Sequence, residues 1–204
     1  VFLMRKDLVP TEEVTVDGEE LLKVEIAGKD FFLPFKILSG NKVAFLDISG
    51  QVEMNEANAD MLVDEMKRRG VKFDTIVNPA AKSNALAHAI AVRWAKDVDP
   101  SLTYTVVARN GKPGETYTVE ASYRSVTSST DKVMYLTDDD AEFLKGKSVL
   151  LLDDVFGGGG TTKALYELVE KAGATVAAHA VVAIEDSPAV PDDLIYLYTL
   201  PLYN

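Results

Sequence analysis

Two adjacent carboxylates and a glycine-rich turn are the residues of this 204-residue chain whose types and spacing best suit chemistry. Asp153 and Asp154 follow the apolar run VLLL at 149–152, and the run GGGGTT occupies 157–162. An ionised carboxylate accepts hydrogen bonds and cannot donate them. The acidic pair therefore suits the vicinal hydroxyls of a sugar better than it suits a second anion.

The glycine-rich turn has the composition of a phosphate site. Glycine tolerates positive φ and lets the backbone approach a ligand without a Cβ in the way. The helix expected after the turn begins with unpaired N–H groups and the positive end of its dipole. We expect the donors to a sugar phosphate to come from Gly157, Gly158, Gly159, Gly160, Thr161 and Thr162. A ribose 5-phosphate would satisfy both the acidic pair and the turn, whereas the alternative is an ordinary strand–turn–helix.

The elements that must position these groups are short apolar strands followed by amphipathic helices. The run 149–152 predicts a strand buried on both faces, and Gly173 ends the helix that follows the glycines. Strands are also predicted at Val43–Ser49, Phe73–Val77, Thr103–Arg109, 132–136 and Thr175–Ile184, with a last strand in the tail, and helices at 55–69, capped by Asn55, and 84–98.

The first 40 residues have a different pattern. Residues 12–35 alternate apolar and polar side chains around Asp17-Gly18 and Ala27-Gly28 turns, which predicts antiparallel strands. We expect an N-terminal β-rich subdomain over 1–40 and a core domain over 41–204, with a mobile loop at 110–131.

Composition narrows the partners. The net charge of −11 opposes a broad nucleic-acid-binding face, so local groups must capture an anionic substrate. The sequence contains no window of eighteen uninterrupted apolar residues, so a membrane span is not expected. The sequence begins without a secretory signal, which favours a cytoplasmic location. With two histidines and no cysteine, we expect no histidine-rich metal site; both His88 and His179 are predicted to be packing residues.

The stretch from Val149 to Thr162 resembles the phosphoribosyl-pyrophosphate (PRPP) motif of type I phosphoribosyltransferases, in which four apolar residues, two acids, two apolar residues and a small loop end in Thr. This resemblance implies an α/β fold with an open, mostly parallel, twisted sheet flanked by helices, and a small β-rich hood. It also implies transfer of ribose 5-phosphate from PRPP to a base nitrogen, with release of pyrophosphate.

The stretch VAFLDIS at 43–49 resembles the base-binding strand V-V-F-R-D-I-S of adenine phosphoribosyltransferases. The resemblance implies that Phe45 stacks on a purine and that backbone groups near Ala44 contact the purine edge. Leu46 stands where the family has Arg. From residue types alone, a core strand with a core Phe is an equal alternative.

Two further segments resemble the pyrophosphate-binding parts of the family. NPAAKS at 78–83 stands where the family has E-S-R-G, which implies that Ala81, Lys82 and Ser83 bind pyrophosphate, although Ala80 replaces the acid. The stretch VVARNGKPGE resembles R-K-x-G-K-L-P-G-E, which implies that Arg109 and Lys112 face the pyrophosphate; the alternative is a solvated basic turn.

The resemblance assigns roles to these residues. Asp153 and Asp154 orient the ribose hydroxyls, while Arg109, Lys112 and a Mg²⁺ ion bound mainly through PRPP stabilise the leaving group. The implied partners are PRPP and a purine base, adenine before xanthine or hypoxanthine, and the implied assembly is a homodimer. One alternative is a protein of the same fold that senses PRPP or a nucleotide without turnover. Another is an α/β domain that binds a different phosphate ester.

Overall fold

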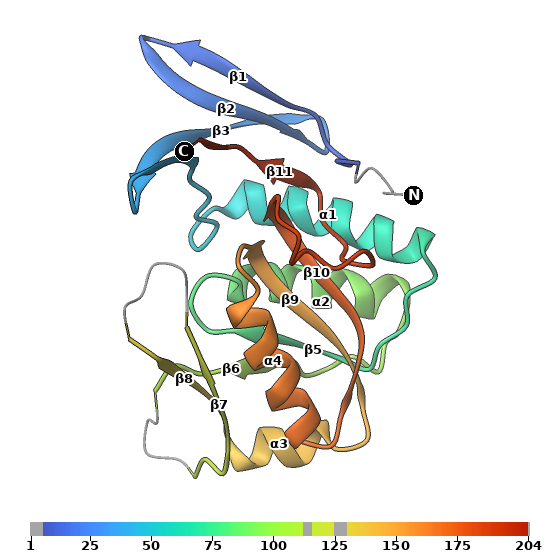
Figure 1. The fold of residues 1–204 in the computed structure, drawn as a ribbon. Helices are drawn as coiled ribbons and strands as arrows, with labels where there is room; N and C mark the ends of the chain where they lie inside the picture. The colour runs from blue at the N-terminus through green and yellow to red at the C-terminus, as the bar shows by residue number, and fades with distance from the viewer. Residues whose placement is uncertain (1–5, 112–115, 125–129, 204) are drawn as a thin grey trace.

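The computed structural model describes residues 6–111, 116–124 and 130–203, so Lys112 lies outside the described residues. Strands and helices alternate through most of the chain (Figure 1). In order they are β1 (Thr11–Val16), β2 (Glu19–Ile26), β3 (Lys29–Leu38), β4 (Asn41–Ala44), α1 (Val52–Arg68), β5 (Thr75–Pro79), α2 (Asn84–Asp97), β6 (Val106–Ala108), β7 (Val119–Tyr123), β8 (Lys132–Leu136), α3 (Asp138–Leu144), β9 (Ser148–Phe156), α4 (Gly160–Lys171), β10 (Thr175–Glu185), β11 (Tyr198–Leu200) and β12 (Leu202–Tyr203).

A five-stranded parallel sheet forms the centre, in the order β11-β10-β9-β5-β6. Successive residues of β9 point to opposite faces, as strand geometry requires. Leu150 and Leu152 pack with α1 and α2, whereas Val149 and Leu151 pack with α4 and the β7–β8 hairpin. Since both faces are covered, β9 is an almost unbroken apolar run, which is the pattern typical of parallel sheets.

The second sheet is antiparallel and has the order β1-β2-β3-β4-β12. Three hairpins build it, and Asp17, Ala27 and Ser39 precede glycines in their turns with φ of 51°. The C-terminal strand β12 pairs with β4, so the chain leaves the parallel sheet at β11 and finishes in this N-terminal sheet. The carboxyl ends of β9 and β10 are directed toward that sheet in Figure 1.

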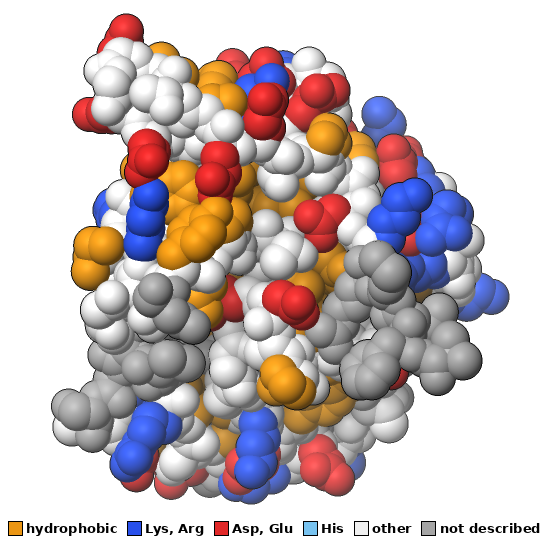
Figure 2. Space-filling model, turned by 45° about the horizontal axis from the view of Figure 1, so that its top comes forward, with side chains coloured by type: hydrophobic (Ala, Val, Ile, Leu, Met, Phe, Trp, Pro, Cys, Tyr) orange, Lys and Arg blue, Asp and Glu red, His pale blue; other side chains and the backbone are white. Residues whose placement is uncertain are grey.

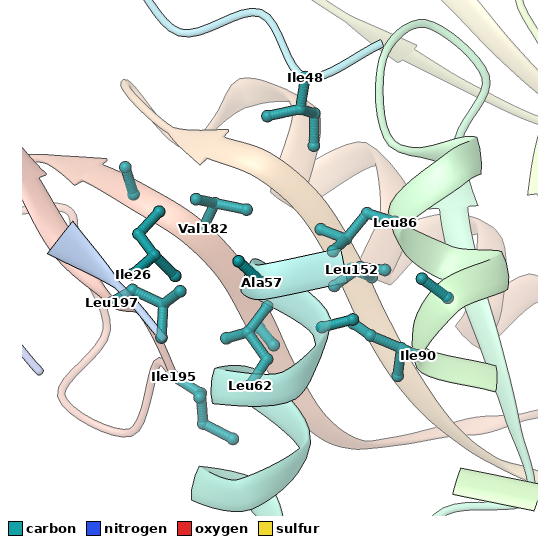
Figure 3. Packing of buried hydrophobic residues seen from close by; sticks show 14 of the residues in the cluster. Ile26, Ile48, Ala57, Leu62, Leu86, Ile90, Leu152, Val182, Ile195 and Leu197 are labelled. Carbon is teal, nitrogen blue, oxygen red and sulfur yellow. The ribbon is translucent and has the colours of Figure 1, made fainter. Parts of the chain in front are cut away.

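The larger core lies between the parallel sheet, helices α1 and α2, and the N-terminal sheet. Figure 3 shows Ala57 and Leu62 of α1 facing Leu152 and Val182 of the sheet. Ile26 of β2 joins the same cluster and is fully buried. The N-terminal sheet is thus held to the parallel sheet by shared apolar packing, which is the main favourable contribution to folding.

The predicted fold class is confirmed: a parallel sheet is flanked by helices, and an antiparallel N-terminal sheet accompanies it. Some local predictions are wrong. Asn55 does not cap α1, which begins at Val52; it is buried inside the helix and donates from Nδ2 to the Ile48 carbonyl. His88 was expected in the core, but it is exposed on α2. The strand expected to reach Ser49 ends at Ala44.

The expected loop at 110–131 contains regular structure. It includes β7, which pairs with the following strand β8 in an antiparallel hairpin from Val119↔Leu136 to Tyr123↔Lys132. Ala121 of β7, and Met134 and Leu136 of β8, are buried in the same cluster as the apolar side of α4. The hairpin therefore lies against the helix that begins at the glycine-rich turn.

Acidic side chains are spread over the face of the molecule drawn in Figure 2. In the part of the chain that the structure describes, no helix combines the length and the apolar character needed to cross a membrane.

Candidate functional site

The acidic pair occupies the carboxyl-terminal half of β9, where open parallel sheets bind ligands. Asp153 and Asp154 are 8% and 9% exposed. Each carboxylate accepts a hydrogen bond from the next residue's backbone: Asp154 N–H donates to Asp153 Oδ1, and Val155 N–H donates to Asp154 Oδ1, both at 2.8 Å. These bonds hold the two carboxylates in fixed orientations.

Burial makes Asp153 an unusual carboxyl group. Desolvation raises its pKa well above the ordinary value, and the negative charge of Asp154 raises it further. A carboxyl group whose ionised form is disfavoured by burial in a core strand is typical of residues kept for function rather than for stability.

Lys82 joins the acidic pair to the predicted base site. Its Nζ lies 3.9 Å from Asp154 Oδ2 and 5.2 Å from the centroid of the Phe45 ring. These three residues come from the loop after β5, from β9 and from the segment after β4. Three of the segments that the sequence predicts to bind PRPP, pyrophosphate and the base thus meet around one ammonium group.

A residue that the sequence analysis assigned to no role also lies at this point. Lys36 of β3 places its Nζ 3.8 Å from the centroid of the Phe45 ring. The neighbouring carboxylate of Asp47 accepts hydrogen bonds from Ser49 N–H and Ser49 Oγ at 3.1 and 2.6 Å. These bonds are the main cause of the lowered pKa of Asp47, with smaller contributions from Lys82 and Lys36.

The glycine-rich turn joins β9 to α4 as predicted. Gly159 is the N-cap residue of α4 and has φ of 86°, a left-handed conformation that favours glycine. Gly160, Thr161 and Thr162 form the first helical turn, whose N–H groups have no partner inside the helix. A Cβ on Gly160 would overlap the backbone carbonyl oxygen of Arg124, so this position also requires glycine.

Glu185 is a neighbour of this turn to which the sequence analysis assigned no role. A Cβ on Gly157 would lie 3.3 Å from Glu185 Oε2, so the carboxylate borders the turn. Partial burial raises the pKa of Glu185. Its place at the end of β10 follows from the parallel pairing of β9 with β10, which no local pattern reveals.

The loop predicted to bind pyrophosphate is internally well tied. Ser83 is fully buried and its hydroxyl donates to the Pro79 carbonyl oxygen at 3.2 Å, so it faces the protein. Asn78 donates to Asn84 Oδ1 at 2.7 Å across the loop. Ala81 is exposed, and Lys82 carries the one cation of the segment. These bonds fix the backbone that precedes α2.

Arg109 lies just after β6. Its backbone N–H and carbonyl group pair with Tyr135 at 2.8 and 2.9 Å, which joins β6 to the β7–β8 hairpin. The side chain is half-buried, and its Nε has no hydrogen-bond partner within the described ranges. An open hollow of about 460 Å³ lies on β2, β3 and β4; Lys36 and Phe35 line it, whereas the acidic pair and the glycines do not.

The model of the phosphoribosyl transferase domain family matches residues 51–199. The chain belongs to this family. The match begins at α1 and includes the acidic pair, the glycine-rich turn and the pyrophosphate loop. The family resemblance predicted from the sequence is therefore confirmed.

Curated relatives of this phosphoribosyl transferase domain include both enzymes and a transcriptional repressor. The adenine phosphoribosyltransferase of Thermosipho africanus (strain TCF52B) is 31% identical over 161 residues, covering 75% of this chain and 84% of the relative. The purine biosynthesis transcriptional repressor PurR of Bacillus subtilis (strain 168) is 24% identical over 183 residues, covering 89% of this chain and 61% of the repressor.

Solved structures share the fold. The adenine phosphoribosyltransferase of Thermoanaerobacter pseudethanolicus has a TM-score of 0.60 at 23% identity, covering 73% of this chain and 82% of its own. That of Saccharomyces cerevisiae, solved with an imino-altritol bisphosphate and adenine, has a TM-score of 0.59 at 18% identity, covering 93% and 94%. The broader of these two superpositions covers more of the chain than the family match over 51–199 does.

Proposed function

We propose that this protein transfers ribose 5-phosphate from PRPP to a purine base, adenine before hypoxanthine or xanthine, and releases pyrophosphate. The observation that carries the proposal is the position of Lys82, between Asp154 at 3.9 Å and the ring of Phe45 at 5.2 Å. A ribose must lie between its base and its diphosphate, and Lys82 joins the segments assigned to each. The adenine phosphoribosyltransferases among the relatives support the choice of base.

The glycine-rich turn supplies positioning. In the proposed complex, the backbone N–H groups and hydroxyls of 157–162 bind the 5-phosphate at the start of α4. With one end of the sugar fixed, C1 of the ribose lies within reach of a base stacked on Phe45. Positioning of this kind replaces a bimolecular encounter by a local step.

The charged residues act on the transition state. As the bond from C1 to pyrophosphate breaks, positive charge develops on the ribose ring and negative charge on the leaving group. Asp153 and Asp154 accept hydrogen bonds from the ribose hydroxyls and stabilise the cationic ring. Lys82 and Arg109 stabilise the departing pyrophosphate, and Lys112, which lies outside the described residues, is proposed to assist. Fixed charges of this kind are among the largest contributions to catalysis.

A Mg²⁺ ion fits this donor set if it is held mainly by the substrate. Among the described residues no group of three or more Asp, Glu or His side chains is arranged to bind a metal. The predicted site offers the ion the adjacent carboxylates of Asp153 and Asp154. When bound with PRPP, the ion would neutralise charge on the diphosphate.

The test is pyrophosphate release from PRPP and Mg²⁺ with adenine, hypoxanthine, xanthine and guanine in turn. Turnover with adenine exceeding that with the other bases is expected. The double variant Asp153→Asn plus Asp154→Asn should lose PRPP binding. The matched control is Asp192→Asn plus Asp193→Asn, an exposed adjacent pair in which the change of charge is the same. PRPP binding by the first variant as tight as by the control would contradict the roles of the acidic pair.

A second candidate is a protein that binds PRPP or a nucleotide without turnover. The match to a transcriptional repressor over 89% of this chain favours it. Gly158, Leu46 and Ala80, which replace the Thr, Arg and acid of the enzyme pattern, favour it too. PRPP binding with no pyrophosphate release in the presence of any purine would select this candidate. A homodimer and a cytoplasmic location, both implied by the resemblance, are proposed for either function.

A further inference from the structure

Lys36 is a cation at the predicted base site that belongs to the N-terminal sheet. The pairing of β3 with β4 fixes its place, since Lys36 is opposite Val43 and Phe35 is opposite Ala44. Phe45 N–H also donates to the Pro34 carbonyl oxygen at 2.8 Å, which continues the contact past the end of β4. The base-binding segment and Lys36 are therefore parts of one hydrogen-bonded unit.

The Lys36 ammonium lies over one face of the Phe45 ring. Its 3.8 Å separation from the ring centroid is about the thickness of one aromatic layer. A purine that stacks on this face of Phe45 must displace the ammonium. The flexible four-carbon stem of a lysine allows Nζ to withdraw to the rim of the ring while it remains at the site.

Lys36 also has free hydrogen-bonding capacity. Among the described residues no carboxylate lies within ion-pair distance of it, whereas Lys82 is paired with Asp154 and Lys42 with Glu20. The nearest acid on the base segment, Asp47, is already engaged by Ser49. An ammonium group donates and cannot accept, so it requires an acceptor on whatever enters the site.

This requirement distinguishes the purines at position 6. Adenine has ring nitrogens that accept hydrogen bonds, but its amino group at position 6 is a donor and cannot accept from the ammonium. Hypoxanthine carries a carbonyl oxygen at that position, and xanthine carries two carbonyl oxygens and loses a proton more readily. A hydrogen bond from a charged donor to a carbonyl oxygen is stronger than one between neutral groups.

We propose that Lys36 is a specificity-determining residue that donates to a carbonyl oxygen of the base and extends the substrate range from adenine toward 6-oxopurines. The proposal rests on the proposed function, because it places the base on Phe45. It assigns to the N-terminal sheet a direct part in the choice of base.

The test compares kcat/KM for adenine, hypoxanthine and xanthine in the wild type, Lys36→Met and Lys36→Arg. In Lys36→Met, the ratio of kcat/KM for either oxopurine to that for adenine should fall about tenfold, as expected for the loss of one charged hydrogen bond. Lys36→Arg should retain most of the ratio, because it keeps a cationic donor.

Lys42→Met is the matched control. Lys42 also lies over aromatic rings, 4.8 Å from the centroid of Phe35 and 5.8 Å from that of Tyr203, and it pairs with Glu20; none of these partners within the described ranges is a predicted site residue. The ratio should be unchanged in this variant. A ratio within twofold of the wild type in Lys36→Met, or an equal fall in Lys42→Met, would overturn the proposal.

Failure of the proposed function gives a different result. If no base supports turnover, calorimetric Kd values for AMP, IMP and XMP replace kcat/KM, and Lys36→Met should lower the preference for IMP and XMP over AMP by the same factor. An unchanged preference would overturn the role of Lys36 alone. Absence of both turnover and nucleotide binding would overturn this proposal together with the proposed function.

Discussion

At the scale of single residues, the site keeps charged groups under conditions that disfavour them. Asp153 is buried beside a second carboxylate, and Glu185 is half-buried beside the turn that is proposed to hold a phosphate. Neither placement stabilises the empty protein. Removing the charge of Asp153 should therefore increase stability, and removing that of Glu185 should increase affinity for the phosphate ligand. Gains of this kind are expected where a residue is kept for function.

Asp153→Asn should raise the free energy of unfolding at pH 7. The pKa of Asp153 is higher in the folded chain than in the unfolded chain, so its contribution to stability is favourable at low pH and is lost as pH rises above the unfolded value. The amide keeps the oxygen that accepts from Asp154 N–H. Urea unfolding at pH 7 and pH 4 should give a gain that is larger at pH 7.

The exposed Asp192→Asn variant is the control for that measurement. It keeps Asp153, so it should not show a gain in the free energy of unfolding over the wild type that is larger at pH 7 than at pH 4. PRPP binding by Asp153→Asn should weaken, since the amide replaces one of the two acceptor oxygens by an NH₂ donor and removes the negative charge. A loss of stability at pH 7 would contradict the assigned cost of the buried charge.

Glu185→Gln should tighten binding of PRPP about fivefold, because it removes a negative charge next to the phosphate-binding turn. Isothermal titration calorimetry at pH 8 measures the change. Burial raises the pKa of Glu185, so the difference between variant and wild type should narrow as pH is lowered. Glu170→Gln, on the exposed side of α4, is the control. Equal affinities at pH 8 would show that Glu185 does not face the ligand.

At the scale of elements, the site depends on where the β7–β8 hairpin meets α4. The Arg124 carbonyl group lies against Gly160 at the start of that helix, and Lys171 near its end donates to the Glu120 carbonyl oxygen at 2.7 Å. The hairpin thus contacts α4 near both of its ends. A side chain added at Gly160 would therefore press on the end of β7.

Gly160→Ala tests this contact. The added Cβ would overlap a backbone oxygen, which cannot move without shifting β7 or the start of α4. Overpacking of this kind costs about 1–3 kcal/mol. Gly50→Ala is the control, because a Cβ there meets no atom within 4 Å and φ is not positive. Differential scanning calorimetry should give a lower Tm for Gly160→Ala than for Gly50→Ala; equal values would contradict the packing.

At the scale of the whole molecule, a buried histidine makes stability depend on pH. His179 of β10 is 5% exposed, contacts the rings of Phe156 and Tyr166, and has no hydrogen-bond partner for either ring nitrogen within the described ranges. Desolvation lowers its pKa to about 4, opposed weakly by Asp193. The unfolded chain therefore binds a proton at a higher pH than the folded chain does.

This difference destabilises the fold as pH falls from about 6.5, the unfolded pKa, to about 4, and the loss over that window is about 3 kcal/mol. His179→Leu should remove it, so the variant's free energy of unfolding should decrease less steeply between pH 7 and pH 4.5. His88→Leu, at an exposed position, should keep the wild-type slope. Parallel slopes for all three proteins would contradict a neutral buried His179.

The sequence by itself determined the strand, the acidic pair, the glycine-rich turn and the helix from 149 to 173, because the groups in this unit are contiguous. It also determined the alternation of strands and helices. Local patterns record which face of an element is apolar; they do not record which element will cover it. This is why Asn55, predicted as a cap, lies buried inside α1, and why the exposure of His88 was missed.

Only the tertiary structure decided which distant residues meet. The parallel order of β5, β9 and β10 brings Lys82 to Asp154 and Glu185 to the glycine-rich turn. The pairing of β3 with β4 brings Lys36 to Phe45, nine residues away in the sequence but on another strand. Such contacts depend on strand pairing and shared core packing, which are properties of the folded chain as a whole.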